Sequence, residues 1–180
     1  MPIVRGRSLR ILYDADMIAR RNRELAGDVA AAGYLDLLVV SILKGSFVFA
    51  ADLIRALHDA GLSPEVEFLS LSSYQSGKVS TGTVRVLRDI ESEVAGRDVL
   101  LIDDILESGR TIDFAKKLMV ERGARRVGIA VLLEKPDKRV QPIEPDHVGF
   151  VCPDLFVVGY GMDDAHAFRE LPFVGVVDDG

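Results

Sequence analysis

Two adjacent carboxylates, Asp103 and Asp104, follow directly on the apolar run 99–102. Such a run has no polar alternation, so it indicates a parallel strand that is covered on both faces. Open α/β sheets bind their ligands at the carboxyl ends of these strands. We therefore expect both carboxylates at the ligand-binding edge of a sheet, although an acidic pair in this place is also typical of a solvated edge or a helix cap.

The turn that follows the carboxylates, residues 107–111, has the composition of an anion site. Gly109 lets the backbone approach a phosphate, and Ser108 and Thr111 offer hydroxyl groups. Helical periodicity begins after the turn, so the first backbone amides of that helix are free to point at an anion. A P-loop does not fit because no Gly-Lys-Ser/Thr follows, and a dinucleotide-binding turn does not fit because the glycine triplet is missing.

Two further predicted strands end in lysine-bearing turns. Residues 37–43 form an apolar run that ends in Lys44-Gly45, and residues 126–133 form another that ends shortly before Lys135. By residue type alone, both lysines are more typical of solvated turns than of a binding site. The functional interpretation stays open at this point, because the two turns are expected at the same edge of the sheet as the carboxylates.

The rest of the chain predicts the elements that position these residues. They are a strand at 9–13, a helix at 14–32 with Asp14 as its cap, a helix after residue 46, and strands at 66–72 and 84–90. The polar, glycine-bearing segment 73–83 separates the last two strands. It fits either a long hairpin or a lid that excludes water from a reacting centre.

Composition limits the class of protein. The 180 residues are 48% hydrophobic and 28% charged, which suits one α/β domain. A net charge of −6 argues against a broad nucleic-acid surface, so any anion site must be local. Cys152 is the only cysteine and cannot form an intrachain disulfide. Because no membrane-span-length apolar run or secretion signal is present, we expect a soluble, cytoplasmic protein with no membrane partner.

Residues 99–111 as a whole resemble the phosphoribosyl diphosphate signature of the type I phosphoribosyltransferases: four apolar residues, two acids, two apolar residues, a variable position, then Ser/Thr-Gly-x-Thr. Leu43-Lys44-Gly45 matches the pyrophosphate loop of the purine-using members, where a non-proline cis peptide is frequent. Ser73-Tyr74 matches the pair that opens their flexible catalytic loop. Residues 153–163 and 168–172 resemble the hood of the hypoxanthine-guanine phosphoribosyltransferases in particular.

The resemblance implies a fold and a reaction. The fold would be a single domain, 1–180, with a central mostly parallel sheet flanked by helices and a small hood built from the N-terminal segment and about 143–180. The reaction would move a 5-phosphoribosyl group from phosphoribosyl diphosphate to N9 of hypoxanthine or guanine in purine salvage, giving IMP or GMP and pyrophosphate. Mg²⁺ would be the cofactor, and the assembly would be a homodimer or homotetramer.

The resemblance also implies a role for each matched residue. Glu107 would be the general base, and the other implied contacts are Ser108, Gly109, Arg110 and Thr111 with the 5-phosphate; Asp103 and Asp104 with the ribose, directly or through Mg²⁺; Asp163 with a second Mg²⁺; Lys44, Gly45 and Arg169 with pyrophosphate; Phe156, Val157 and Lys135 with the purine; and Ser73 and Tyr74 in the catalytic loop. Two positions depart from the family pattern. Glu107 stands where Asp is usual, and Asp103 stands where many members carry Glu.

Two alternatives remain at this stage. One is a phosphoribosyltransferase that prefers xanthine, because backbone groups can satisfy the exocyclic group of either guanine or xanthine. The other belongs to a different class, an RNA-binding regulator on the same scaffold. Such a regulator needs a basic face, which the net charge of −6 does not favour.

Overall fold

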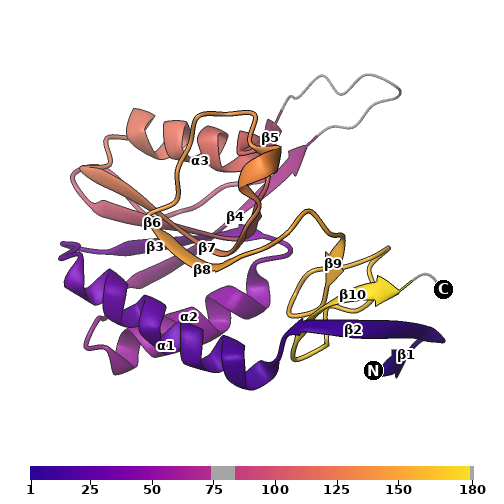
Figure 1. Ribbon diagram of the computed structural model, residues 1–180. Helices are drawn as coiled ribbons and strands as arrows, with labels where there is room; N and C mark the ends of the chain where they lie inside the picture. Colours follow the sequence, from indigo (N-terminus) through magenta and orange to yellow (C-terminus); the bar gives the residue numbers. More distant parts are fainter. Residues whose placement is uncertain (74–83, 179–180) are drawn as a thin grey trace.

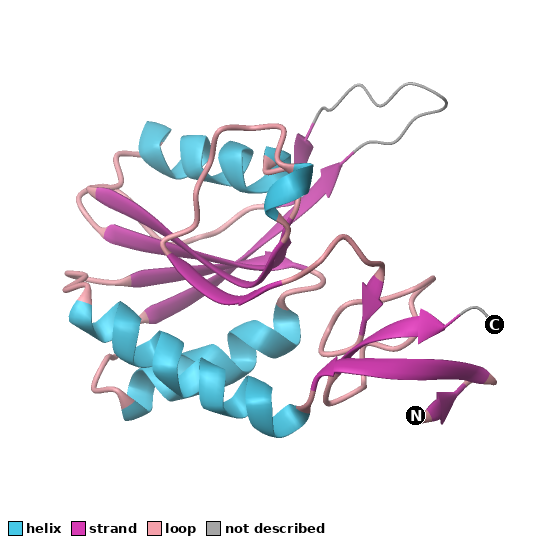
Figure 2. Ribbon diagram, viewed as in Figure 1, coloured by secondary structure: helices cyan, strands magenta, loops and turns pink. Residues whose placement is uncertain are grey.

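The computed structural model describes residues 1–73 and 84–178, which form a six-stranded sheet with helices on both faces and a smaller four-stranded sheet beside one end (Figures 1 and 2). The large sheet has the order β5-β4-β3-β6-β7-β8, with bounds Val84–Arg88, Glu65–Ser73, Leu38–Leu43, Asp98–Leu106, Arg126–Glu134 and His147–Val151. All neighbouring pairs are parallel except β4 and β5. The predicted class, a mostly parallel α/β sheet flanked by helices, is confirmed.

The three central strands, β3, β6 and β7, explain the unbroken apolar runs of the sequence. In the shared register, Val40 pairs with Leu101, which in turn pairs with Ile129. All three side chains are fully buried, because helices cover the sheet on both sides. The central strands are therefore rigid supports for whatever follows them at their carboxyl ends.

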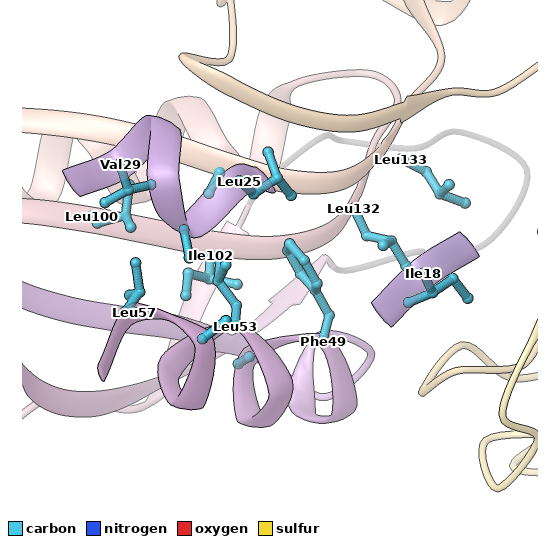
Figure 3. Close-up of a cluster of buried hydrophobic side chains, with 14 of the residues drawn as sticks. Ile18, Leu25, Val29, Phe49, Leu53, Leu57, Leu100, Ile102, Leu132 and Leu133 are labelled. Atoms are coloured by element: carbon cyan, nitrogen blue, oxygen red, sulfur yellow. The ribbon is translucent and has the colours of Figure 1, made fainter. Parts of the chain in front are cut away.

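Helices α1 (Ala15–Ala31) and α2 (Phe47–Asp59) cover one face of the sheet, and α3 (Arg110–Glu121) covers the other (Figure 1). The predicted cap is confirmed, because the Asp14 carboxylate accepts a hydrogen bond of 2.8 Å from the Met17 amide. Figure 3 shows the apolar core beneath α1 and α2, with Ile18, Leu25, Val29, Phe49, Leu53, Leu57, Leu100, Ile102, Leu132 and Leu133.

The four-stranded sheet joins the two ends of the chain. Its order is β1-β2-β10-β9, with bounds Ile3–Val4, Arg7–Tyr13, Val174–Asp178 and Val157–Val158, and every pair is antiparallel. The predicted hood began too early, at about 143. Strand β8 belongs to the large sheet, where Ala130 pairs with His147 and Leu133 with Phe150. It covers the edge of β7, which would otherwise expose unpaired backbone groups.

Within the described residues, none of the helices combines the length and the apolar character that crossing a membrane requires.

Candidate functional site

The carboxyl ends of β3, β6 and β7 lie side by side and bring the predicted site segments together. Lys44-Gly45 follows β3, and Lys135 follows β7. One expectation was wrong in detail: Asp103 and Asp104 lie within β6, not after it. The strand continues to Leu106 because β7 still offers it a partner, Glu134. The carboxylates are therefore held by sheet hydrogen bonding and not by a loop.

The acidic pair is electrostatically costly, with Asp103 buried and Asp104 partly buried. Asp103 is only 7% exposed, and its carboxylate accepts a hydrogen bond of 3.0 Å from the Asp104 amide. Burial and the neighbouring Asp104 charge raise the pKa of Asp103 well above its usual value. Burial also raises the pKa of Asp104, although the nearby Arg169 charge opposes that shift. A bound cation would stabilise the ionised forms of both groups.

The predicted anion-binding turn after β6, residues 107–111, is held in place by backbone hydrogen bonds. Gly109 has a φ of +82°, a left-handed conformation that favours glycine, and it forms the N-terminal cap of α3. The Ser108 carbonyl accepts hydrogen bonds of 3.0 Å from the amides of both Val140 and Gln141. Arg110 and Thr111 begin the helix. A cavity of about 170 Å³ opens here, lined by Asp103, Ile105, Leu106, Glu107, Ser108, Gly109, Thr111 and Ile112.

The turn after β3 lies directly against the acidic pair. The Leu43–Lys44 peptide is cis, as the family resemblance implied, and the Lys44 side chain is exposed. A Cβ atom at Gly45 would lie 1.8 Å from Asp104 Oδ2, and a Cβ atom at Gly161 would lie 2.3 Å from the Gly45 carbonyl oxygen. Only glycines permit this approach of β3, β6 and the segment after β9. Sequence reasoning missed Gly161, although it stands inside the hood motif.

Asp163 and Arg169 form an ion pair with each other, with 2.7 Å between Asp163 Oδ1 and Arg169 Nη2. The same guanidinium donates a hydrogen bond of 2.7 Å to the Gly161 carbonyl. The His166 amide donates to the other carboxylate oxygen of Asp163. The resemblance assigned these two side chains to separate ligands, a metal and pyrophosphate, whereas the structure places them in contact.

Lys135 is buried, whereas residue type alone is more typical of a solvated turn. Its side chain is 7% exposed, and Nζ lies 3.6 Å from Glu107 Oε1, while the Glu107 side chain is 47% exposed. The turn is closed by an ion pair of 2.7 Å between Arg139 and Glu134, and the Lys135 amide donates to Leu106 O at 3.0 Å. Sequence reasoning missed this ion pair, for which the charged run 134–139 was the available signal.

The remaining predicted residues lie around this edge or outside the description. The Phe156 side chain is 61% exposed, whereas Val157 is buried in β9. Ser73 is the last residue of β4. Tyr74, and with it the proposed lid up to residue 83, lies outside the described residues.

The comparisons with known proteins agree with this geometry. A family model for the phosphoribosyl transferase domain matches residues 8–165. The chain belongs to the phosphoribosyltransferase family. The hypoxanthine-guanine phosphoribosyltransferase of Bacillus subtilis is 39% identical over 170 residues, which cover 93% of this chain and 92% of that protein. The hypoxanthine-guanine phosphoribosyltransferase structure from Bacillus anthracis superimposes with a TM-score of 0.88 at 35% identity, covering 94% of this chain and 99% of the other.

Some of the relatives that the chain matches are much longer proteins. The bifunctional protein TilS/HprT of Listeria innocua is 41% identical over 169 residues, which cover 93% of this chain. The chain spans only 26% of that bifunctional protein, so the similarity extends to a single part of it.

Proposed function

We propose that this phosphoribosyltransferase acts in purine salvage as a single domain, transferring the 5-phosphoribosyl group of phosphoribosyl diphosphate to N9 of hypoxanthine or guanine. The observation that carries the proposal is the Lys135 ammonium. Its side chain is only 7% exposed beside the turn after β6, and its ion-pair partner among the described residues is Glu107, at the long distance of 3.6 Å between Nζ and Oε1. A buried charged donor in this state favours a ligand acceptor, for which a 6-oxo group is suitable.

The purine side of the reaction uses three groups. Lys135 donates to the 6-oxo oxygen, the exposed Phe156 ring stacks on the base, and the Val157 backbone reads its polar edge. Glu107 takes the proton from N7 as N9 forms its bond to the sugar carbon and the bond from that carbon to pyrophosphate breaks. Glu107 is within reach of this task because its half-exposed carboxylate already faces Lys135.

The phosphoribosyl diphosphate side of the reaction uses charged and polar groups to bind the 5-phosphate, the ribose and the pyrophosphate. Ser108 to Thr111 hold the 5-phosphate at the start of α3, and Asp103 and Asp104 face the ribose hydroxyls and the positive charge that develops on the sugar. Lys44, the Gly45 amide and Arg169 hold the leaving pyrophosphate.

Mg²⁺ fits this donor set. Asp103, Asp104 and Asp163 are hard oxygen ligands, and because the pKa values of Asp103 and Asp104 are raised, a cation there would stabilise their ionised forms. No group of three or more described His, Cys, Asp or Glu residues forms a ligand cluster by itself. Magnesium therefore fits as an ion shared with substrate oxygens, and it would supply positive charge to the leaving pyrophosphate.

A base panel tests the proposal. The purified protein is supplied with phosphoribosyl diphosphate, Mg²⁺ and, separately, hypoxanthine, guanine, xanthine or adenine, and nucleotide formation is measured. We expect IMP and GMP to form and AMP not to form. A clear preference for xanthine would replace the proposed substrate with the alternative one, and no turnover of any base would refute the proposal.

Removal of the metal gives an independent prediction. Excess EDTA should abolish IMP formation, because the contacts to the leaving group are suited to a metal-bound pyrophosphate, and added Mg²⁺ should restore it. The rate of IMP formation before and after chelation measures this. Full activity in EDTA would show that the carboxylates serve the sugar without a metal.

We also propose that the enzyme is a homodimer or homotetramer of the cytoplasm. The family resemblance supports this assembly, and light scattering of the purified chain measures it. A monomeric mass at assay concentration would contradict it.

A further inference from the structure

One buried hydroxyl outside the proposed binding contacts connects the hood to both helices on that side of the sheet. Tyr160 is 4% exposed. Its hydroxyl accepts a hydrogen bond of 2.8 Å from the Asn22 side chain on α1 and donates one to the Asp52 carboxylate on α2. Burial, and then the Asp52 contact, raises the pKa of Tyr160, so the hydroxyl keeps its proton and donates at any working pH.

The backbone at Tyr160 is tied just as closely to the pyrophosphate side of the site. The Tyr160 amide donates to the Leu171 carbonyl at 2.9 Å, and the Gly161 amide donates to the Arg169 carbonyl at 3.0 Å. Arg169 returns a hydrogen bond to Gly161 and pairs with Asp163. A displacement of Tyr160 would therefore carry Gly161, Asp163 and Arg169 with it.

Asp52, which accepts the hydrogen bond from the Tyr160 hydroxyl, connects the tyrosine to the pyrophosphate side through α2. Asp52 lies in α2, which begins at Phe47, directly after the Lys44-Gly45 turn and Ser46. The backbone of Gly161 rests on the Gly45 carbonyl, because a Cβ there would lie 2.3 Å from its oxygen. The Tyr160–Asp52 hydrogen bond is thus a second link between the turn after β3 and the segment that carries the Asp163–Arg169 pair.

On the purine side, Val157 is held by the pairing of β9 with β10, and Lys135 is held by contacts of its own. The Lys135 backbone amide donates a hydrogen bond to the Leu106 carbonyl oxygen, and the Glu134–Arg139 ion pair closes the turn. Within the described residues, none of the groups that hold Lys135 forms a hydrogen bond or an ion pair with Tyr160, Asp52 or Asn22. They come from β6, β7 and the turn after β7.

We propose that Tyr160 is a positioning residue that aligns Asp163 and Arg169 with the Lys44-Gly45 turn and thereby sets the affinity for the pyrophosphate end of the substrate, not for the purine. This inference rests on the proposed phosphoribosyl transfer. It assigns a function to a tyrosine that the proposed reaction does not use.

Kinetics of Tyr160→Phe in both directions test the inference. We expect the KM values for phosphoribosyl diphosphate and, in the reverse reaction, for pyrophosphate to rise about tenfold, the effect of losing one buried hydrogen bond. The KM for hypoxanthine should stay within about twofold of the parent value. Tyr34→Phe is the matched control: Tyr34 is 7% exposed, and its hydroxyl bonds His147 at 3.2 Å beside Gly128, near the start of β7.

Two substitutions at Asp52 keep the inference falsifiable if Tyr160→Phe does not fold. Asp52→Asn retains an oxygen acceptor for the tyrosine and should behave like the parent, whereas Asp52→Leu should reproduce the rise in the two phosphate KM values. The inference is overturned by unchanged KM values in Tyr160→Phe and Asp52→Leu, by equal increases for hypoxanthine and pyrophosphate, or by a fall in kcat alone.

Hydrogen exchange separates a failure of this inference from a failure of the proposed function. If the parent forms no nucleotide, the proposed function fails and the positioning is judged from amide exchange in segment 159–171. That segment should exchange faster in Tyr160→Phe than in the parent and should be unchanged in Tyr34→Phe. Equal exchange in Tyr160→Phe and the parent would overturn the positioning role as well.

Discussion

At the scale of single residues, Glu107 is one of the two positions that depart from the pattern of the family the chain resembles, and the role proposed for it depends on how far its side chain reaches. Glutamate is one methylene longer than aspartate, which moves the carboxylate by about 1 to 1.5 Å if the backbone is unchanged. In the structure its carboxylate faces Lys135, with 3.6 Å between Oε1 and Nζ. The longer side chain therefore points at the group proposed to bind the base.

The first residue-scale prediction follows from this placement. Glu107→Gln should lower kcat for hypoxanthine by about a hundredfold and change KM little, because a general base acts mainly in the transition state. Glu107→Asp should keep or raise the rate. Steady-state kinetics of the two variants provide the measurement. A glutamine variant as fast as the parent would remove Glu107 from the proposed mechanism.

A second residue-scale prediction concerns Lys135. Lys135→Met should raise the KM for hypoxanthine about tenfold or more and leave the KM for phosphoribosyl diphosphate nearly unchanged, because the donor to the 6-oxo group is lost while the apolar stem is kept. Methionine is the suitable replacement because the side chain is 7% exposed, so alanine would also leave a cavity. An unchanged KM for hypoxanthine would show that the purine binds elsewhere.

At the scale of elements, the close approach of β3 and β6 depends on Gly45. Gly45→Ala should lower kcat/KM for phosphoribosyl diphosphate by about a hundredfold, because its Cβ would lie 1.8 Å from Asp104 Oδ2 and one of the two must move. Gly27→Ala is the matched control. Gly27 lies in α1 with nothing within 4 Å of an added Cβ, so alanine should raise the free energy of unfolding by roughly 0.5–1 kcal/mol. Equal kinetics in both variants would contradict the proposed contact.

The elements also differ in how far the sequence alone could predict them. The apolar runs of β3, β6 and β7 and the Asp14 cap are local signals, so the three strands, their parallel orientation and the start of α1 were predictable. The extension of β6 past Asp104 was not, because it depends on the partner strand β7. The burial of Lys135 depends on an ion pair closed by Arg139, and the contact between Gly45 and Gly161 joins segments more than 100 residues apart.

At the scale of the whole molecule, the proposed site lies where the two sheets meet. The large sheet supplies the turns after β3 and β7 and the acidic pair, and the segment between β9 and β10 supplies Asp163 and Arg169. The small sheet in turn depends on β2, from the first residues of the chain, pairing with β10 from the last. Correct placement of the pyrophosphate contacts therefore requires both ends of the chain.

Stability against acid is a property of the whole fold that one buried histidine should influence. His147 begins β8 and bonds the Tyr34 hydroxyl, and it is 8% exposed. Burial lowers its pKa below the usual 6.5, and Arg126 acts in the same direction, while Asp146 and Asp28 oppose the shift. The folded chain therefore binds a proton at His147 less readily than the unfolded chain does.

The sign of the pH dependence follows directly. Above about pH 6.5 the histidine is neutral in both states and its protonation does not affect the free energy of unfolding; as the pH falls through 6.5, the unfolded chain takes up the proton first and stability is lost. The free energy of unfolding, measured in urea between pH 8 and pH 5, should therefore fall less steeply in His147→Gln than in the parent. His58→Gln, at an exposed position of α2, is the control substitution. Identical slopes in all three proteins would mean that the buried histidine takes up its proton as readily as a free one.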